Sequence, residues 1–219
     1  MKQDVAVTEV VDVVRCARAL VFDFDGTLVD SNPIKWRAFE LCFVDFPKHG
    51  SEILAYCLSH NHTPRGDKFQ HVYEKILGLP YTPEIAAVLH KRFEAATTRQ
   101  IIEAPEVPGA EQFLARARRR HRIALLSSTP QEILLHILAE RGWRGYFETI
   151  QGAPVDKIDW LKGFREKRGL GEQDVVFFGD TSEDAKAASE AKCTFVAVGS
   201  DITEISIVYR IRNFVQLLS

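Results

Sequence analysis

The sequence lacks most of what marks a secreted, membrane or disulfide-stapled protein. Apolar runs such as Ala19–Phe22 and Val175–Phe178 are far too short to span a bilayer. The N-terminus has neither the apolar core nor the cleavage site of a signal peptide, which favours a cytoplasmic protein with reduced thiols. No disulfide framework is expected, because the four cysteines are scattered without paired spacing: Cys16, Cys42, Cys57 and Cys193.

A strong net charge is missing as well. The formal net charge of −2 is too small for the long-range field that gathers nucleic acid or anionic lipid. The basic run Arg116–Arg122 ends a predicted helix and lacks interleaved aromatic residues, so we interpret it as a solvated helix end. We therefore expect a small partner, with no nucleic acid and no membrane.

Short apolar runs alternate with helical patterns along much of the chain. Near-continuous apolarity indicates strands buried on both faces, as in a parallel sheet covered by helices on either side. The pattern predicts a doubly wound α/β core. Its expected strands are Ala19–Phe24, Ile123–Ser127, Phe147–Gln151, Val175–Gly179 and Thr194–Val198.

Helix signals follow several of these runs. Ala110, Phe113, Leu114 and Ala117 form an i, i+3, i+4, i+7 stripe. A further helix is expected to run to Gly142, with Thr129 as N-cap, Pro130 at its first position and Glu132 completing a capping box. Val5–Ala17 is expected to form an N-terminal helix packed on the core.

Between about residues 31 and 105 the sequence shows no strand pattern; its pattern there is helical, and it is rich in aromatic and charged residues. We therefore expect a core domain of residues 1–30 and 106–219 with an inserted helical cap of residues 31–105. Within the cap, Thr63–Asp67 forms a polar break before a helix expected at Lys68–Leu77.

The most informative segment is Asp23 to Asp30, with the letters DFDGTLVD, at the end of an apolar run. In an extended chain residues i and i+2 face the same way, so Asp23 and Asp25 are expected to project together beyond the strand end. Gly26 lets the chain turn away sharply. An aspartate here often only caps a turn, but two buried together are costly without a metal or another cation.

This segment resembles the first motif of the haloacid dehalogenase superfamily of aspartate-nucleophile phosphotransferases, and the other motifs follow in order. Ser127 matches the second motif; its hydroxyl and the adjacent helix N-terminus suit a phosphate oxygen, although serine is also a common helix cap. Lys157 matches the third at a strand-to-helix junction. Its charge could neutralise a bound phosphate together with the nucleophile, although most lysines are simply solvated.

The fourth motif is matched by a Gly-Asp-x-x-x-Asp arrangement after Val175–Phe178. Asp180 can reach a metal there, and Asp184 in the first helical turn can orient the metal's waters or Lys157. The resemblance covers about Ala19 to Ser200. The inserted region resembles the cap of the phosphoglycolate phosphatase and β-phosphoglucomutase branch.

The resemblance implies a role for each matching residue. Asp23 attacks phosphorus, Asp25 protonates the leaving oxygen and later activates water, and Mg²⁺ binds Asp23, Asp180 and the carbonyl of Asp25. An alkoxide leaving group needs a proton donor and a halide does not, so Asp25 favours phosphoryl transfer over dehalogenation. Supporting positions are Gly26, Thr27 and Ser128.

Substrate contacts are less well defined. Ser128 occupies a position where relatives often have Asn, and the stretch before Lys157 lacks the common Lys-Pro-x-Pro motif. Arg65 in the polar break can meet a second anionic group, and a solvated loop arginine is an equally good interpretation.

Together these features predict a magnesium-dependent phosphatase that hydrolyses a small phosphorylated metabolite, such as a sugar phosphate or phosphoglycolate, through an aspartyl phosphate. A mutase of the β-phosphoglucomutase kind shares every catalytic residue and differs in its product. A non-catalytic binding or regulatory protein of the same fold is a third alternative, which normally comes with loss of one of the motif residues; none is lost here. The sequence does not define an oligomeric state.

Overall fold

The structure, a computed structural model, describes residues 7–60, 63–199 and 209–218. It divides the chain into two units, one of Met1–Asp30 with Ala104–Ser219 and one of Ser31–Glu103. The expected boundaries placed residues 104 and 105 in the insert instead of the core. The function of the second unit as a cap remains a prediction.

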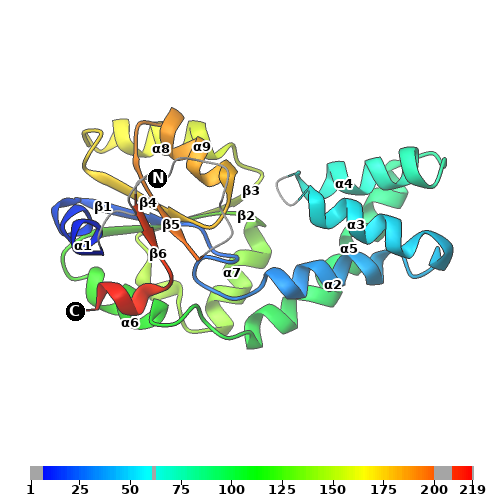
Figure 1. The fold of residues 1–219 in the computed structure, drawn as a ribbon, viewed down its shortest axis with the longest axis horizontal. Coiled ribbons are helices and arrows are strands. Elements are labelled where there is room, and N and C mark those ends of the chain that lie inside the picture. The colour runs from blue at the N-terminus through cyan, green and yellow to red at the C-terminus, as the bar shows by residue number, and fades with distance from the viewer. Residues whose placement is uncertain (1–6, 61–62, 200–208, 219) are drawn as a thin grey trace, which may run out of the picture. The chain divides into compact units, whose positions relative to one another are not determined.

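Within the described residues, the first unit is built on a six-stranded parallel sheet with the order β3-β2-β1-β4-β5-β6 (Figure 1). The strands are β1 (Ala19–Phe22), β2 (Arg122–Pro130), β3 (Thr149–Ala153), β4 (Val175–Gly179), β5 (Thr194–Val198) and β6 (Tyr209–Ile211). Central β1 pairs with β2 on one side and with β4 on the other. The strand order reverses direction there, and open α/β sheets bind ligands beyond the strand ends at such a point.

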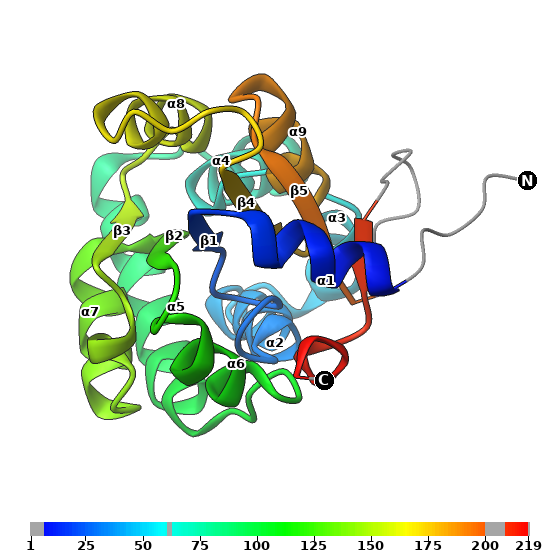
Figure 2. The ribbon, with the colours of Figure 1, turned by 90° about the vertical axis from the view of Figure 1, so that its left-hand side faces the viewer.

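Helices cover both faces of this sheet, which confirms the predicted doubly wound α/β core. Figures 1 and 2 show α8 (Lys157–Lys167) and α9 (Ser182–Glu190) on one face, with α6 (Ala110–Ala117) and α7 (Gln131–Glu140) on the other. The side chains of β1 alternate between the two layers. Val21 joins the core that includes Leu161 of α8, and the ring of Phe22 stacks on Phe178 at 4.8 Å and contacts Phe113 of α6. Burial on both faces explains the continuous apolar runs.

The remaining elements of the first unit lie at its ends and connections. The N-terminal helix is α1 (Val7–Cys16), which is shorter than the expected Val5–Ala17; residues 5 and 6 lie outside the described part. Two 3₁₀ turns are η3 (Arg144–Tyr146) and η4 (Phe214–Leu217). The ring of Phe214 packs against those of Phe22 and Phe113, so the C-terminal segment completes the aromatic core.

Among its described residues the second unit forms helices joined by turns and loops, with no strand, as predicted for this stretch. It contains α2 (Asn32–Cys42), η1 (Pro47–His49), α3 (Gly50–Ser59), α4 (Arg65–His71), the π-helical turn η2 (Val72–Ile76) and α5 (Pro83–Glu103). Phe39, Phe69 and Phe93 meet edge to face in its own core. Across residues 7–60, 63–199 and 209–218, the chain forms no helix with both the length and the apolarity needed to cross a bilayer.

Several predicted boundaries were wrong. Strand β1 ends at Phe22 instead of Phe24, and β3 spans Thr149–Ala153 instead of Phe147–Gln151, with Phe147 serving as the C-cap of the turn η3. Helix α4 starts at Arg65 instead of Lys68. Strand β6 was not predicted, because it has only three residues at the edge of the sheet.

The predicted capping box at Thr129 was also wrong. Strand β2 continues to Pro130, and α7 runs from Gln131 to Glu140 instead of starting at Pro130 and reaching Gly142. No side chain caps this helix, because its N-cap residue is Pro130, which has no side-chain acceptor; the hydroxyl of Thr129 bonds to Asp25 instead.

Candidate active site

Asp23 follows the last residue of β1 and lies at the carboxyl end of the sheet. Its N–H donates to the carbonyl of Phe178 in β4 at 2.9 Å, and only 6% of the residue is exposed. Three residues later Gly26 has a φ of 78°, a left-handed conformation that glycine adopts without strain, and the chain turns away from the strand.

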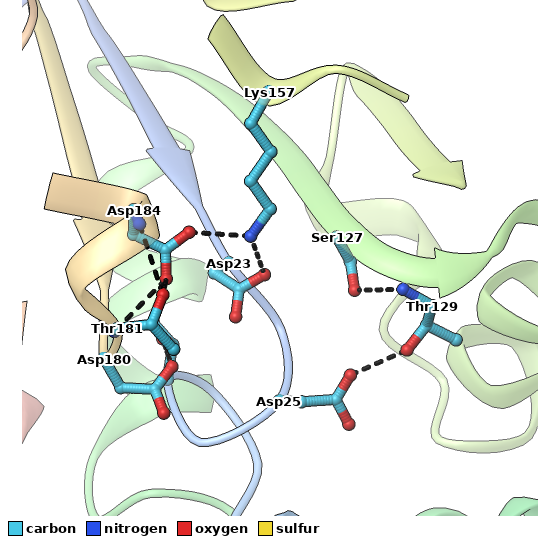
Figure 3. Close-up of polar contacts among 9 residues, drawn as sticks. Asp23, Asp25, Ser127, Thr129, Lys157, Asp180, Thr181 and Asp184 are labelled. Atoms are coloured by element: carbon cyan, nitrogen blue, oxygen red, sulfur yellow. Dashed lines mark hydrogen bonds and ion pairs between the residues drawn. The ribbon is translucent and has the colours of Figure 1, made fainter. Parts of the chain in front are cut away.

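Lys157 forms ion pairs with both Asp23 and Asp184 (Figure 3). The Nζ of Lys157 lies 2.9 Å from Oδ1 of Asp23 and 2.7 Å from Oδ1 of Asp184. Lys157 is the first residue of α8, a start stabilised by Asp156, whose side chain accepts from the N–H of Asp159 at 2.9 Å. Of the two contacts expected of Asp184, the structure shows the one to Lys157.

Asp184 is itself held by the start of α9. Thr181 is the N-cap, its hydroxyl donates to Oδ2 of Asp184 at 2.6 Å, and the two residues form a capping box. Asp184 is fully buried. A Cβ added at Gly179 would lie 2.5 Å from the Cβ of Asp184, so the absence of a side chain at this position lets the carboxylate approach β4.

A cluster of carboxylates surrounds this ion pair. Asp23, Asp180 and Asp184 each offer one oxygen, and these oxygens lie within 4.8 Å of one another. The Oδ1 of Asp180 accepts a hydrogen bond of 2.9 Å from the hydroxyl of Thr27, a fully buried residue. Thr27, which was expected only to support the site, therefore contacts one of its expected metal ligands directly.

Burial and neighbouring charges set the protonation of this cluster. Burial raises the pKa of Asp23 to about 8; Lys157 opposes the rise, and Asp184 and Asp180 add to it. Burial by itself would lower the pKa of Lys157, but Asp184 and Asp23 outweigh it and hold that pKa above its ordinary value. Lys157 thus pairs with two of the three carboxyl groups, those of Asp23 and Asp184, and the third, that of Asp180, adds negative charge that favours binding of a cation.

Asp25 belongs to a second group of contacts (Figure 3). Its Oδ2 accepts a hydrogen bond of 2.7 Å from the hydroxyl of Thr129, and the N–H of Thr129 donates to Oγ of Ser127 at 3.1 Å. All three residues are buried. The structure thus brings Asp25 and Ser127 to the same threonine, while Asp23 pairs with Lys157.

Thr129 was not among the predicted site residues. Its position two residues after Ser127 was the available signal, because residues i and i+2 of an extended chain share a face. The adjacent Pro130 and Glu132 instead suggested a helix start. Ser128 lies between the two and is exposed.

Arg65 lies in the second unit, where it is not a freely solvated arginine. Its guanidinium packs 4.7 Å from the centre of the Phe93 ring, and one nitrogen lies 3.5 Å from Oε1 of Glu94. Burial lowers the pKa of Arg65, and Glu94 opposes this effect. Binding of a substrate group by Arg65 remains a prediction.

Comparison with known proteins identifies the family of this chain. The profile of the haloacid dehalogenase-like hydrolase family matches residues 20–198. A phosphoglycolate phosphatase of Synechococcus elongatus is 27% identical over 184 residues, covering 83% of each chain.

Solved structures of low identity share the fold. One is the hydrolase YfnB of Bacillus subtilis bound to magnesium, with a TM-score of 0.67, 16% identity, and coverage of 92% of this chain and 96% of that one. Another is CbbY of Rhodobacter sphaeroides in complex with xylulose-1,5-bisphosphate, with a TM-score of 0.70, 17% identity, and coverage of 90% and 95%. The family profile spans most of the sequence, and this chain is therefore a phosphatase of the haloacid dehalogenase-like hydrolase family.

Proposed function

We propose that this phosphatase depends on Mg²⁺ and removes phosphate from a small phosphorylated metabolite by way of an acyl phosphate on Asp23. The observation that carries the proposal is the position of Asp23. It is buried at the end of the central strand, 2.9 Å from Lys157, and shares a cluster of carboxylate oxygens with Asp180 and Asp184.

The donor set of this cluster fits a hard divalent cation. All the clustered ligand atoms are carboxyl oxygens, which Mg²⁺ prefers, and the three carboxyl groups outnumber the single ammonium group beside them. Asp23 and Asp180 are the proposed ligands, with the carbonyl of Asp25. When bound, the ion neutralises charge on the transferring phosphoryl group.

The side chains then divide the reaction between them. An oxygen of Asp23 forms a bond to phosphorus while the bond from phosphorus to the leaving oxygen breaks, and Asp25 gives its proton to that oxygen. Lys157 reduces the repulsion between the nucleophile and the phosphate, and the hydroxyl of Ser127 donates to a phosphate oxygen. In the second step Asp25 accepts a proton from water, whose oxygen attacks phosphorus and releases the carboxylate of Asp23 with inorganic phosphate.

For the substrate we propose an alkyl phosphate of small size, either phosphoglycolate or a sugar phosphate. A phosphoglycolate phosphatase is among the relatives at 27% identity, and CbbY, which shares the fold, was solved with a sugar bisphosphate. The net charge of −2 also gives no field for a polyanionic polymer.

A panel of phosphate esters tests the proposal. Purified protein is mixed with phosphoglycolate, sugar phosphates and nucleotides, in Mg²⁺ or in EDTA, and inorganic phosphate is measured. We expect release from one compound in Mg²⁺ and none in EDTA, with Asp23→Asn inactive under both conditions. Equal release in EDTA contradicts the metal requirement. An isomerised sugar phosphate without free phosphate indicates the mutase instead.

A further inference from the structure

Thr129 connects two residues of the proposed reaction. Its hydroxyl lies 2.7 Å from Oδ2 of Asp25, a bond between positions 104 residues apart in the sequence. Both residues are 8% exposed, so bulk water competes little for this hydrogen bond. Its N–H meanwhile donates to Oγ of Ser127. A hydroxyl that accepts one hydrogen bond keeps its own proton to donate, so Ser127 stays able to bind a phosphate oxygen.

The backbone of Thr129 is fixed by the neighbouring strand. A Cβ added at Gly152 in β3 would lie 2.6 Å from the carbonyl oxygen of Thr129, so the two chains approach more closely here than a side chain permits. The side chain of Gln131, two residues after Thr129, also binds β3. Its Oε1 accepts a hydrogen bond from the N–H of Gly152, and its Nε2 donates to the carbonyl of Ile150 at 3.4 Å. The hydroxyl of Thr129 is therefore presented to Asp25 from a rigid position.

We propose that Thr129 is the positioning residue for the acid–base carboxyl group of Asp25, an inference that rests on the proposed function. By donating to Oδ2, Thr129 fixes the orientation of the carboxyl group that exchanges a proton with the reactants. That proton passes from Asp25 to the leaving oxygen as the P–O bond breaks, and a proton from water returns to Asp25 in the second step. Thr129 keeps its own proton throughout.

Replacement by valine separates this role from a structural one. Thr129→Val keeps the shape and the N–H that bonds to Ser127, and it removes only the hydroxyl. A misplaced acid affects esters that need protonation, so we expect phosphoryl transfer from an alkyl phosphate to slow by about 10- to 100-fold, a part of the roughly 100- to 10,000-fold that general acid catalysis supplies. Transfer from 4-nitrophenyl phosphate, a good leaving group, is expected to change by less than about threefold.

The assay is the single-turnover rate of the first step, measured in Mg²⁺ with both esters, together with KM. Thr129→Ser restores the hydroxyl and should recover the alkyl phosphate rate. Thr97→Val is the matched control, because Thr97 is also buried, in the second unit, and its hydroxyl donates to the carbonyl of Phe93 at 2.8 Å. We expect Thr97→Val to leave both rates unchanged.

Three outcomes overturn the inference while the proposed function stands. Equal slowing of both esters in Thr129→Val, or failure of Thr129→Ser to restore the rate, assigns Thr129 a structural role. Unchanged rates for both esters show that Asp25 needs no such support. A wild-type protein that releases no phosphate in Mg²⁺ from any ester refutes the proposed function itself, and the inference with it.

Discussion

Replacing Lys157 by methionine tests the electrostatics of the carboxylate cluster. Methionine keeps much of the length and volume of the side chain but removes the ammonium group, which lies 2.9 Å from Asp23 and 2.7 Å from Asp184. The side chain of Lys157 is 15% exposed, and that of Asp184 is fully buried. Removal of one partner from such a pair costs about 3–5 kcal/mol of unfolding free energy, because the remaining charges stay buried.

The measurement is urea unfolding of the metal-free protein near neutral pH. Lys192→Met is the matched control: its ammonium also lies 2.9 Å from a carboxylate, that of Glu172, but the two side chains are 65% and 61% exposed. An exposed pair contributes about 0–1 kcal/mol. We therefore expect Lys157→Met to lose several times more stability than Lys192→Met.

Two further measurements connect this loss to the cluster. Adding Asp184→Asn to Lys157→Met removes one buried negative charge and should recover part of the loss. Mg²⁺ should stabilise Lys157→Met more than the wild type, because the cation replaces the missing positive charge. Equal losses in Lys157→Met and Lys192→Met, with no additional effect of Mg²⁺, would refute the electrostatic reasoning.

Two other predictions concern packing and pH. Gly179→Ala should cost about 1–3 kcal/mol and reduce turnover, because the new Cβ would lie 2.5 Å from that of Asp184; Gly163→Ala in α8, where a Cβ has open space, should gain up to about 1 kcal/mol in the same unfolding assay. Burial lowers the pKa of His121, whose Nδ1 lies 2.9 Å from the carbonyl of Ala17. The folded protein then binds this proton less tightly than the unfolded chain, so stability is full above the ordinary pKa of 6.5 and falls as the pH drops below it. A His121→Gln variant should lose less stability than the wild type between mildly alkaline and mildly acidic pH, and an equal loss would contradict this.

The fold was predictable because its strands are buried on both faces. Val175–Gly179 and Thr194–Val198 were predicted with the bounds that the structure has, since a continuous apolar run bounded by polar residues leaves little ambiguity. Asp23 and Asp180 could be placed at the sheet's carboxyl edge for the same reason, because each comes directly after such a strand.

Tertiary contacts determine the features that the sequence pattern did not predict. Thr129 has a local partner in the predicted capping box and a distant one in Asp25, and the distant partner takes its hydroxyl. A local pattern cannot show which partner a hydroxyl prefers. Arg65 likewise lay in an apparent polar break, but it is the first residue of α4, and Phe93 and Glu94 of α5 contact its guanidinium.

The central claim is that phosphate passes through Asp23, and a rapid acid quench during turnover tests it most directly. The protein is mixed with its substrate and Mg²⁺, quenched within the first turnover, and analysed by intact mass and peptide mapping. We predict one phosphoryl group on the peptide that contains Asp23 in the wild type and none in Asp23→Asn. Turnover by the wild type with no phosphoryl group on that peptide, or turnover by Asp23→Asn at the wild-type rate, would contradict the claim.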